Sequence, residues 1–179
     1  MIVFDFKPLL LDEHVSIRPL VPDDFEELYA VAKDPLIWEQ HPNPDRYKKN
    51  VFELYFKGAI ESNGAFMIYD TLTNHPIGSS RYYDFSIEKN LICIGYTFLA
   101  RDHWGSTHNH ALKKIMLNHA FKYVDSVIFH IGANNIRSQK AMEKLGGIKT
   151  NEIEVAYYSE PSKLNFEYEI TQERWNAPQ

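Results

Sequence analysis

The stretch YTFLARDHWGSTHNHALKKIMLNHAF, residues 96–121, decides the fold of this chain. It predicts a strand that ends near Ala100 and then a helix, because apolar residues recur at helical spacing after the letters GST. The apolar stripe comprises Leu112, Ile115, Met116, His119 or Ala120, and Tyr123. The first N–H groups of a helix have no partners, and small residues before them let a phosphate group approach. Gly105, Ser106 and Thr107 therefore indicate an anion site, with a plain strand-to-helix turn as the alternative.

Three of the four histidines in this stretch, His103, His108 and His110, fall within eight positions. A zinc site needs side chains that converge on one point. A helix would point His108 and His110 to opposite sides, and no Cys or Glu joins them. We therefore expect no metal. The letters HNH also name a nuclease motif, but its ββα-metal setting and basic flanks are lacking in this sequence.

Length and composition indicate one domain over residues 1–179. The net charge is −5 and the basic residues are scattered, which argues against a nucleic-acid partner and weakly suits a small cationic substrate. Cys93, the single cysteine, is expected to be a small buried residue without a disulfide. The N-terminal segment lacks a signal-peptide cleavage site, and no apolar run approaches the ~20 residues that cross a bilayer. We expect a cytoplasmic protein with no membrane partner.

Working outward from residues 96–121, periodicity and turn residues predict an α+β domain with one mixed sheet of about seven strands. Residues 65–100 form a β-meander of three strands, and the next strand follows the central helix in parallel. The predicted strands are 14–21, 65–71, 77–87, 91–100, 126–133, 148–158 and 165–175. The predicted helices are 22–34, 47–62, 110–124 and 135–147, the last stopped by Gly146 and Gly147. The inner face of helix 47–62 is expected to comprise Val51, Leu54, Tyr55 and Ile60.

The quoted stretch and IFHIGANNIRSQKAMEKLGG, residues 128–147, together resemble the acyl-CoA signature of the GNAT N-acetyltransferases. The branch that they resemble most is the ribosomal-protein-alanine acetyltransferase-like (RimJ/RimL-type) one. The segments IRPLVPDDFEELY (17–29) and FEYEITQERW (166–175) match that branch too, so the resemblance covers about residues 15–175. It implies a three-layer α/β/α fold around a mixed, mostly antiparallel sheet, with acetyl-CoA as the co-substrate.

The resemblance also implies a binding site for the cofactor. The backbone of Phe98, Leu99 and Ala100 would pair with the pantetheine arm. Amides from Gly105 to His110, the loop that follows Trp104, would hold the pyrophosphate; the residues between are Ser106, Thr107, His108 and Asn109. Asn135 and Ser138 would contact the cofactor near its thiol, with helix capping as the alternative reading. Lys113 and Lys114 would lie near the phosphates, or would simply be solvated on an exposed face.

The sequence departs from the family pattern at two positions. Thr107 stands where the family usually has Gly, which adds a Cβ near the phosphates. Met142 stands where many members have a Tyr that protonates the leaving thiolate, and Met cannot donate a proton. Tyr83 or Tyr96 could replace that acid, although strand tyrosines are mostly packing residues.

Acyl transfer to an amine also needs a proton acceptor, because at pH 7 only about one alkylamine in a thousand is neutral. The candidates are Asp84, Glu88, His75 and His103. The amide of Leu99 would stabilise the oxygen of the thioester in the transition state.

We therefore expect direct, acetyl-CoA-dependent transfer to a primary amine of a small molecule or a protein N-terminus. The alternative is a GNAT-fold module that binds acyl-CoA or a partner without turnover. Aromatic C-terminal strands could pair across a homodimer.

Overall fold

The computed structural model describes residues 3–177 and contains one eight-stranded sheet, with strand order β1-β2-β3-β4-β5-β6-β8-β7. All neighbouring strands are antiparallel except β5 and β6, which are parallel. The strands are β1 Leu10–Leu11, β2 Val15–Pro19, β3 Ala65–Asp70, β4 Pro76–Ser86, β5 Leu91–Leu99, β6 Ser126–Gly132, β7 Ile148–Ala156 and β8 Ser162–Thr171. The predicted fold class, the meander β3–β5 and the parallel crossover to β6 are confirmed.

Two ends of the sheet differ from the prediction. The additional strand is β1, whose Leu10 lies opposite Ile17 of β2. A strand of two residues is too short to produce an alternating pattern, so the sequence could not reveal it. At the other end, the strand predicted to reach residue 175 stops at Thr171, whose side chain accepts a hydrogen bond from the Arg174 N–H and begins the helix α6.

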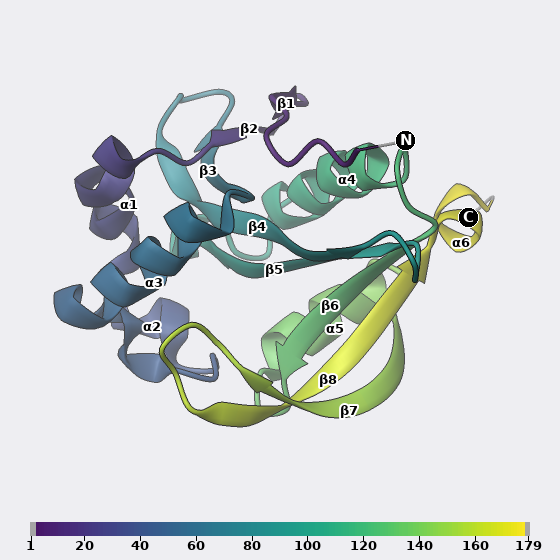
Figure 1. Ribbon diagram of the computed structural model, residues 1–179. Coiled ribbons are helices and arrows are strands. Elements are labelled where there is room, and N and C mark those ends of the chain that lie inside the picture. The colour runs from purple at the N-terminus through teal and green to yellow at the C-terminus, as the bar shows by residue number, and fades with distance from the viewer. Residues whose placement is uncertain (1–2, 178–179) are drawn as a thin grey trace.

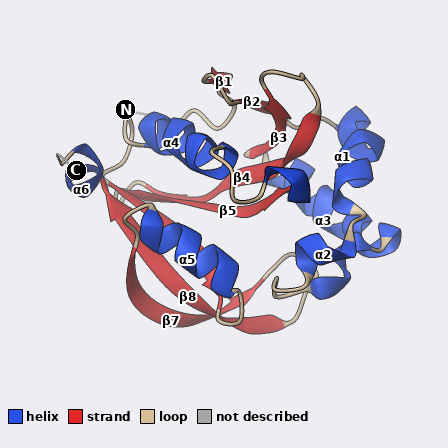
Figure 2. Ribbon diagram, turned by 180° about the vertical axis from the view of Figure 1, so that it is seen from behind, coloured by secondary structure: helices blue, strands red, loops and turns tan. Residues whose placement is uncertain are grey.

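The helices form two layers, one on each side of the sheet. Figure 2 shows α4 and α5 together on one face, and α1, α2 and α3 gather beyond β3 to β5, as Figure 1 also shows. The α-helices are α1 Phe25–Ala32, α2 Pro35–Trp38, α3 Lys49–Ser62, α4 His108–Ala120, α5 Ile136–Lys144 and α6 Gln172–Asn176. Three short 3-10 helices join them: η1 Pro22–Asp24, η2 Pro44–Tyr47 and η3 Arg101–His103. The predicted helix 22–34 is thus η1 followed by α1.

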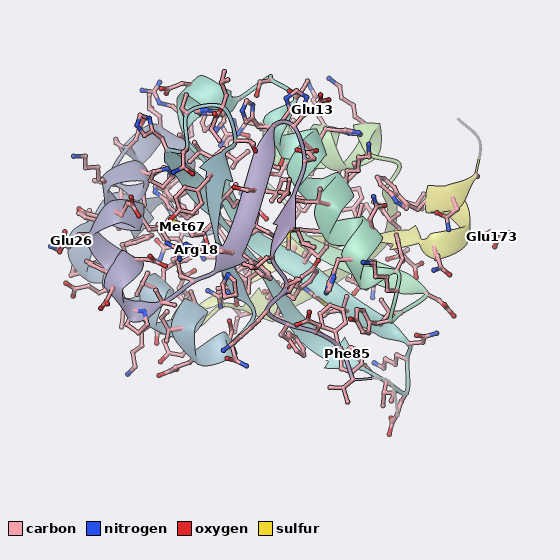
Figure 3. The ribbon with its side chains drawn as sticks, turned by 90° about the horizontal axis from the view of Figure 1, so that it is seen from above. Glu13, Arg18, Glu26, Met67, Phe85 and Glu173 are labelled. Atoms are coloured by element: carbon pink, nitrogen blue, oxygen red, sulfur yellow. The ribbon has the colours of Figure 1, made fainter. Side chains whose placement is uncertain are left out.

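Each layer of helices encloses its own core, and alternate residues of β3 supply both. Phe66 and Ile68 pack with the residues of α4 and α5. Met67, which lies opposite Arg18 of β2, packs with α1 to α3 (Figure 3). This alternation produces the three-layer arrangement, in which the sheet is covered on both faces.

The prediction for the inner face of α3 was partly wrong. Leu54 is 45% exposed, whereas Phe52 and Phe56 are buried beside the correctly predicted Tyr55. Phe52, Tyr55, Phe56 and Ala59 follow one another at the spacing of a single helical stripe, so the helix is turned relative to the predicted face.

The second half of the chain follows the sequence closely. Helix α5 ends before Gly146, whose φ of 94° lies in the region that glycine adopts easily. Cys93 is a buried free thiol, as predicted. Among residues 3–177, no helix combines the length and the apolar character that spanning a bilayer requires.

Candidate active site

The strands β5 and β6 diverge from a common base (Figure 1), and residues of both strands line a cleft. Within residues 3–177 the two strands pair only over Leu91–Cys93 and Ser126–Ile128, although they continue to Leu99 and Gly132. The cleft has a volume of about 230 Å³, and the start of α4 and the inner side of α5 complete its walls. One edge of β5 is therefore free to pair with an extended ligand.

The amide of Leu99 faces this free edge. The N–H of Ala100 donates to the carbonyl of Ile77 on β4 at 2.7 Å, so Ala100 belongs to a hydrogen-bonded pair. Leu99 lies opposite Gly78 and is the next residue along, so its N–H and C=O point away from β4. Consistent with this, the Leu99 carbonyl accepts the indole N–H of Trp104 at 2.9 Å.

Of the three backbone positions predicted to pair with pantetheine, only Leu99 has its N–H directed at the cleft. The N–H of Ala100 is engaged by β4, and Phe98 lies opposite Ser79 in the same ladder. The sequence pattern could not show this, because the direction of each amide depends on the register with β4. The side chain of Phe98 is buried among α1 to α3.

A β-bulge precedes this position and places Tyr96 in the cleft. The register with β4 shifts between Ser79 and Arg81, and Tyr96 has a φ of 53°. The guanidinium of Arg81 lies 3.8 Å from the centroid of the Tyr96 ring. Burial raises the pKa of the Tyr96 hydroxyl, so this group is protonated at pH 7 and can donate a hydrogen bond. The hydrophobic pattern of the sequence cannot show a strand bulge. Tyr96 was nevertheless predicted from the sequence as a possible proton donor.

The loop before α4 lies at the outer end of the cleft. Trp104, Gly105 and Asn109 line the cleft, whereas the side chains of Ser106 and Thr107 are exposed at the rim. Gly105 has a φ of 68° and open space around it. Thr107 is the N-cap of α4, and its side chain makes no capping bond. The N–H of His108 donates to Ser106 Oγ at 3.4 Å, and the N–H groups after it keep the donor character expected of a helix start. His108 begins the helix, and His110 is exposed.

Lys113 enters the cleft from the second turn of α4, whereas the sequence left open whether it lies near the phosphates or on a solvated face. It is 7% exposed, and its Nζ donates to Thr97 Oγ1 of β5 at 2.7 Å. The same nitrogen lies 5.6 Å from the ring centroid of Phe129 on β6. Burial lowers its pKa to about 7. A signal was present in the sequence, since Lys113 shares a helical stripe with Met116, Leu117 and Ala120. Lys114 is exposed, as expected.

The start of α5 forms the opposite wall. Asn135 is 3% exposed, and its side chain accepts the N–H of Ser138 at 3.1 Å, so it caps the helix. Both residues also line the cleft, as does Met142 one turn further on. Asn135 therefore caps α5 and lines the cleft at the same time. Arg137 stacks on the indole of Trp104 at 3.8 Å and joins this wall to the loop before α4.

The end of the cleft near α2 and η2 contains residues that the sequence did not connect with the site. Arg46 is 3% exposed and holds Glu160 through two hydrogen bonds of 2.8 Å, beneath the ring of Tyr157. Burial, followed by the charges of Arg46 and Arg137, lowers the pKa of His41 to about 3, so this imidazole is neutral at pH 7. No periodicity marks these residues, because they meet only when the loops fold over the cleft.

Glu88, a predicted proton acceptor, is not brought to the cleft. It is exposed in the turn between β4 and β5, next to the end of β5 that pairs with β6. The cleft opens at the other end of β5, beyond Cys93. His103, the other predicted catalytic side chain, does line the cleft.

His103 and His108 meet an unexpected third residue, Asp70 at the end of β3. The Nε2 of His108 lies 2.8 Å from Asp70 Oδ2, and the Nε2 of His103 lies 3.5 Å from the same oxygen. The N–H of Thr73, followed by His108, lowers the pKa of Asp70, so its carboxylate is ionised at pH 7. No metal was expected because His108 and His110 would point to opposite sides and no Cys or Glu joins the histidines in sequence. The fold instead brings His103 and His108 together with Asp70, which lies 33 residues before His103.

Comparisons with known proteins agree with this geometry. The chain matches the profile of the Acetyltransferase (GNAT) domain over residues 14–148. A GCN5-related N-acetyltransferase from Brucella melitensis is similar in structure, with a TM-score of 0.80 and 14% identity over 96% of this chain and 81% of that one. The GNAT-family acetyltransferase from Bacillus anthracis has a TM-score of 0.70 and 15% identity over 93% and 99% of the two chains.

RimJ of Mycobacterium smegmatis, solved in complex with CoA-disulfide, has a TM-score of 0.71 and 14% identity over 91% of this chain and 84% of its own. At such identities the similarity concerns the fold. Among curated protein sequences, no relative matches the chain.

Proposed function

Because the chain belongs to the GNAT acetyltransferase family, we propose that it transfers the acetyl group of acetyl-CoA directly to a primary amine. The acceptor is a small molecule or a protein N-terminus. The observation that carries this proposal is the open half of β5, where the Leu99 amide faces a cleft that ends at the start of α4. Such an edge suits an extended arm ending in phosphates.

The cofactor would occupy the cleft from end to end. Its pantetheine arm would accept the N–H of Leu99, and its diphosphate would meet the amides from Gly105 to His110, at the positive end of α4. Asn135 and Ser138 line the opposite wall. Lys113 is buried between the two strands. In its ammonium form it would donate a hydrogen bond to the pantetheine arm or to the thioester oxygen.

The transfer then needs two proton movements. A neutral amine attacks the thioester carbon, the oxygen gains charge and the thiolate leaves. The amine proton would pass to water in the cleft, because His103 Nε2 faces Asp70 and His41 is too weak a base to hold it. Tyr96 would protonate the thiolate in place of the absent family tyrosine. Since the thiol pKa of about 8.5 is close to neutral, the demand for this acid is mild.

The RimJ/RimL-type branch remains the finer part of the proposal. It is supported by the motifs at residues 17–29 and 166–175 and by the similarity in fold to RimJ. A protein N-terminus would then be the acceptor. The residues around the acceptor end of the cleft, among them Arg46 and Tyr157, would determine the choice.

The second candidate is an acyl-CoA-binding module without turnover. Two observations favour it: Met142 lines the cleft where the family has its acid, and Thr107 replaces a glycine in the loop. Met142 would remove proton donation to the thiolate without affecting binding of the pantetheine arm, and Thr107 would crowd only the diphosphate end of the cofactor.

Incubation with acetyl-CoA and a panel of amines and N-terminal peptides, followed by measurement of free thiol, tests the proposal. We expect CoA to raise the melting temperature and at least one amine to release thiol above the hydrolysis rate. A thermal shift without turnover on any amine would indicate the binding module. No shift with CoA would exclude both functions.

A further inference from the structure

We propose that Asp70, His103 and His108 form a binding site for zinc or a similar divalent transition metal. These three side chains form the only group of this kind among residues 3–177, and their ligand atoms lie within 4.8 Å of one another. The site stands beside the cleft and does not depend on acetyl transfer. Two imidazoles and one carboxylate are donors that zinc accepts, with a fourth position left for water.

The three ligands come from different parts of the fold. Asp70 ends β3, His103 ends η3 and His108 begins α4. They are largely shielded, with side-chain exposures of 10%, 21% and 17% in that order. A cation at this point would therefore fasten the loop before α4 to the edge of the β3–β4 hairpin.

Two of the three separations between ligand atoms are close to those that a metal needs. Tetrahedral zinc with bonds of about 2.1 Å holds its ligand atoms roughly 3.4 Å apart. The separation between His103 Nε2 and Asp70 Oδ2 is 3.5 Å. The 2.8 Å separation between His108 Nε2 and the same oxygen would have to open by roughly half an ångström. Both adjustments are within the reach of a side-chain rotation.

The hydrogen bonds around His108 are compatible with a cation in the site. The hydroxyl of Ser106 donates to the carbonyl of His103 at 2.6 Å, and a hydroxyl has one proton to give. Its oxygen, 2.9 Å from His108 Nδ1, must then accept a proton from that nitrogen. A neutral His108 with its proton on Nδ1 presents a lone pair on Nε2 to the carboxylate of Asp70. That contact is repulsive unless a metal ion or an additional proton lies between the two atoms.

Two of the three ligands, His108 and Asp70, have the outer hydrogen-bond partners of a metal site. Ligating histidines usually donate their second N–H to an outer partner, which fixes the ring. Ser106 fills this role for His108. Thr73 holds the other oxygen of Asp70 through its N–H at 2.7 Å and its hydroxyl at 3.1 Å, which leaves Oδ2 directed at the histidines. The buried Nδ1 of His103 has no protein partner.

Titration of untagged, chelator-treated full-length protein with ZnCl₂, followed by calorimetry, tests the site. We expect one zinc per chain and a rise of the melting temperature with zinc concentration. His108→Gln and Asp70→Asn should each weaken binding by more than ~100-fold, since loss of an outer partner alone costs about 10- to 100-fold. His110→Gln, an exposed histidine on the same helix, is the matched control and should bind as the parent does.

Absence of saturable binding to the parent protein would overturn the site and leave a protonated His108 paired with Asp70. Zinc binding that persists at full affinity in His108→Gln would overturn it as well. If His108→Gln does not fold, as judged by circular dichroism, His103→Gln replaces it with the same expected loss.

Discussion

The two halves of β5 are both largely apolar but have different surroundings. In the first half, Leu91–Cys93 pairs with β4 on one edge and with β6 on the other, and Ile92 is fully buried. In the second half, β6 has diverged, the strand bulges at Tyr96, and the N–H of Leu99 faces a cleft. The comparison shows that a binding edge needs no special residue types. It arises where a neighbouring strand turns away and leaves backbone donors without partners.

The open half is stabilised differently from the closed half. Where β6 no longer pairs, the side chain of Lys113 spans the gap from Thr97 toward Phe129. A buried amine without a carboxylate partner is costly, whereas backbone pairing in the closed half is not. The fold thus accepts a local loss of stability at the position where we place the cofactor.

The largest effect is expected at the outer end of the open half. Thr107→Glu would place a carboxylate at the proposed diphosphate site, and like charges ~4 Å apart repel by about 4 kcal/mol at the effective dielectric constant of a protein surface. We expect CoA affinity, measured by calorimetry, to fall at least ~100-fold with little change in melting temperature. Thr107→Ser is the matched control. Unchanged CoA affinity in the Glu variant would show that the loop does not hold the diphosphate.

A second variant tests the buried amine between the halves. The pKa of Lys113 is lowered by burial to about 7, from 10.5. The unfolded chain therefore binds more protons than the folded one between pH 7 and pH 10, and stability should rise across that window. Lys113→Met should abolish this rise and should increase the free energy of unfolding by ~2–4 kcal/mol at pH 7, since one pKa unit corresponds to about 1.4 kcal/mol. Denaturant unfolding at several pH values measures both.

Although Lys113→Met should be more stable than the parent without ligand, it should bind CoA more weakly. The ammonium form favours an anionic ligand, so CoA affinity of the parent should fall as the pH rises through 7, whereas Lys113→Met should bind more weakly with a flat profile. Lys114→Met, the exposed neighbour, should match the parent in both measurements. An identical pH profile for the Lys113 and Lys114 variants would contradict the position of this amine.

The smallest effect concerns the wall opposite β5. Asn135→Ala removes the cap that accepts the N–H of Ser138, which should lower the free energy of unfolding by about 1 kcal/mol. If Asn135 also contacts the cofactor, CoA affinity should fall in addition. Asn135→Ser preserves the cap and separates the two roles. Equal CoA affinity in the Ala and parent proteins would leave capping as its only role.

Most of the fold could be predicted from the sequence, because the elements have long periodic patterns and clear stop signals. The meander of residues 65–100 and the helix before Gly146 are examples. The features that were missed depend on contacts rather than patterns. The two-residue β1 has no period to detect, and the direction of the Leu99 amide depends on its register with Gly78.

The sequence predicted the backbone segments of the candidate site but not the charged side chains that the fold brings to it. The loop before α4 and the strand end at Leu99 could be found, because both lie in one continuous stretch. Asp70 could not be connected with His108 across 38 residues without the antiparallel pairing that brings β3 beside the cleft. Lys113 was within reach of sequence reasoning, since its helical stripe faces inward, but a lysine is rarely placed in a core.

The most direct test compares the amides of the two halves of β5 by residue-resolved hydrogen exchange, with and without CoA. We predict that exchange at Leu99 and at Gly105–His110 slows strongly when CoA binds, while Ile92 and Cys93, already paired within the sheet, remain unchanged. If CoA binds and exchange at Leu99 is unaltered, the open edge of β5 does not hold the cofactor.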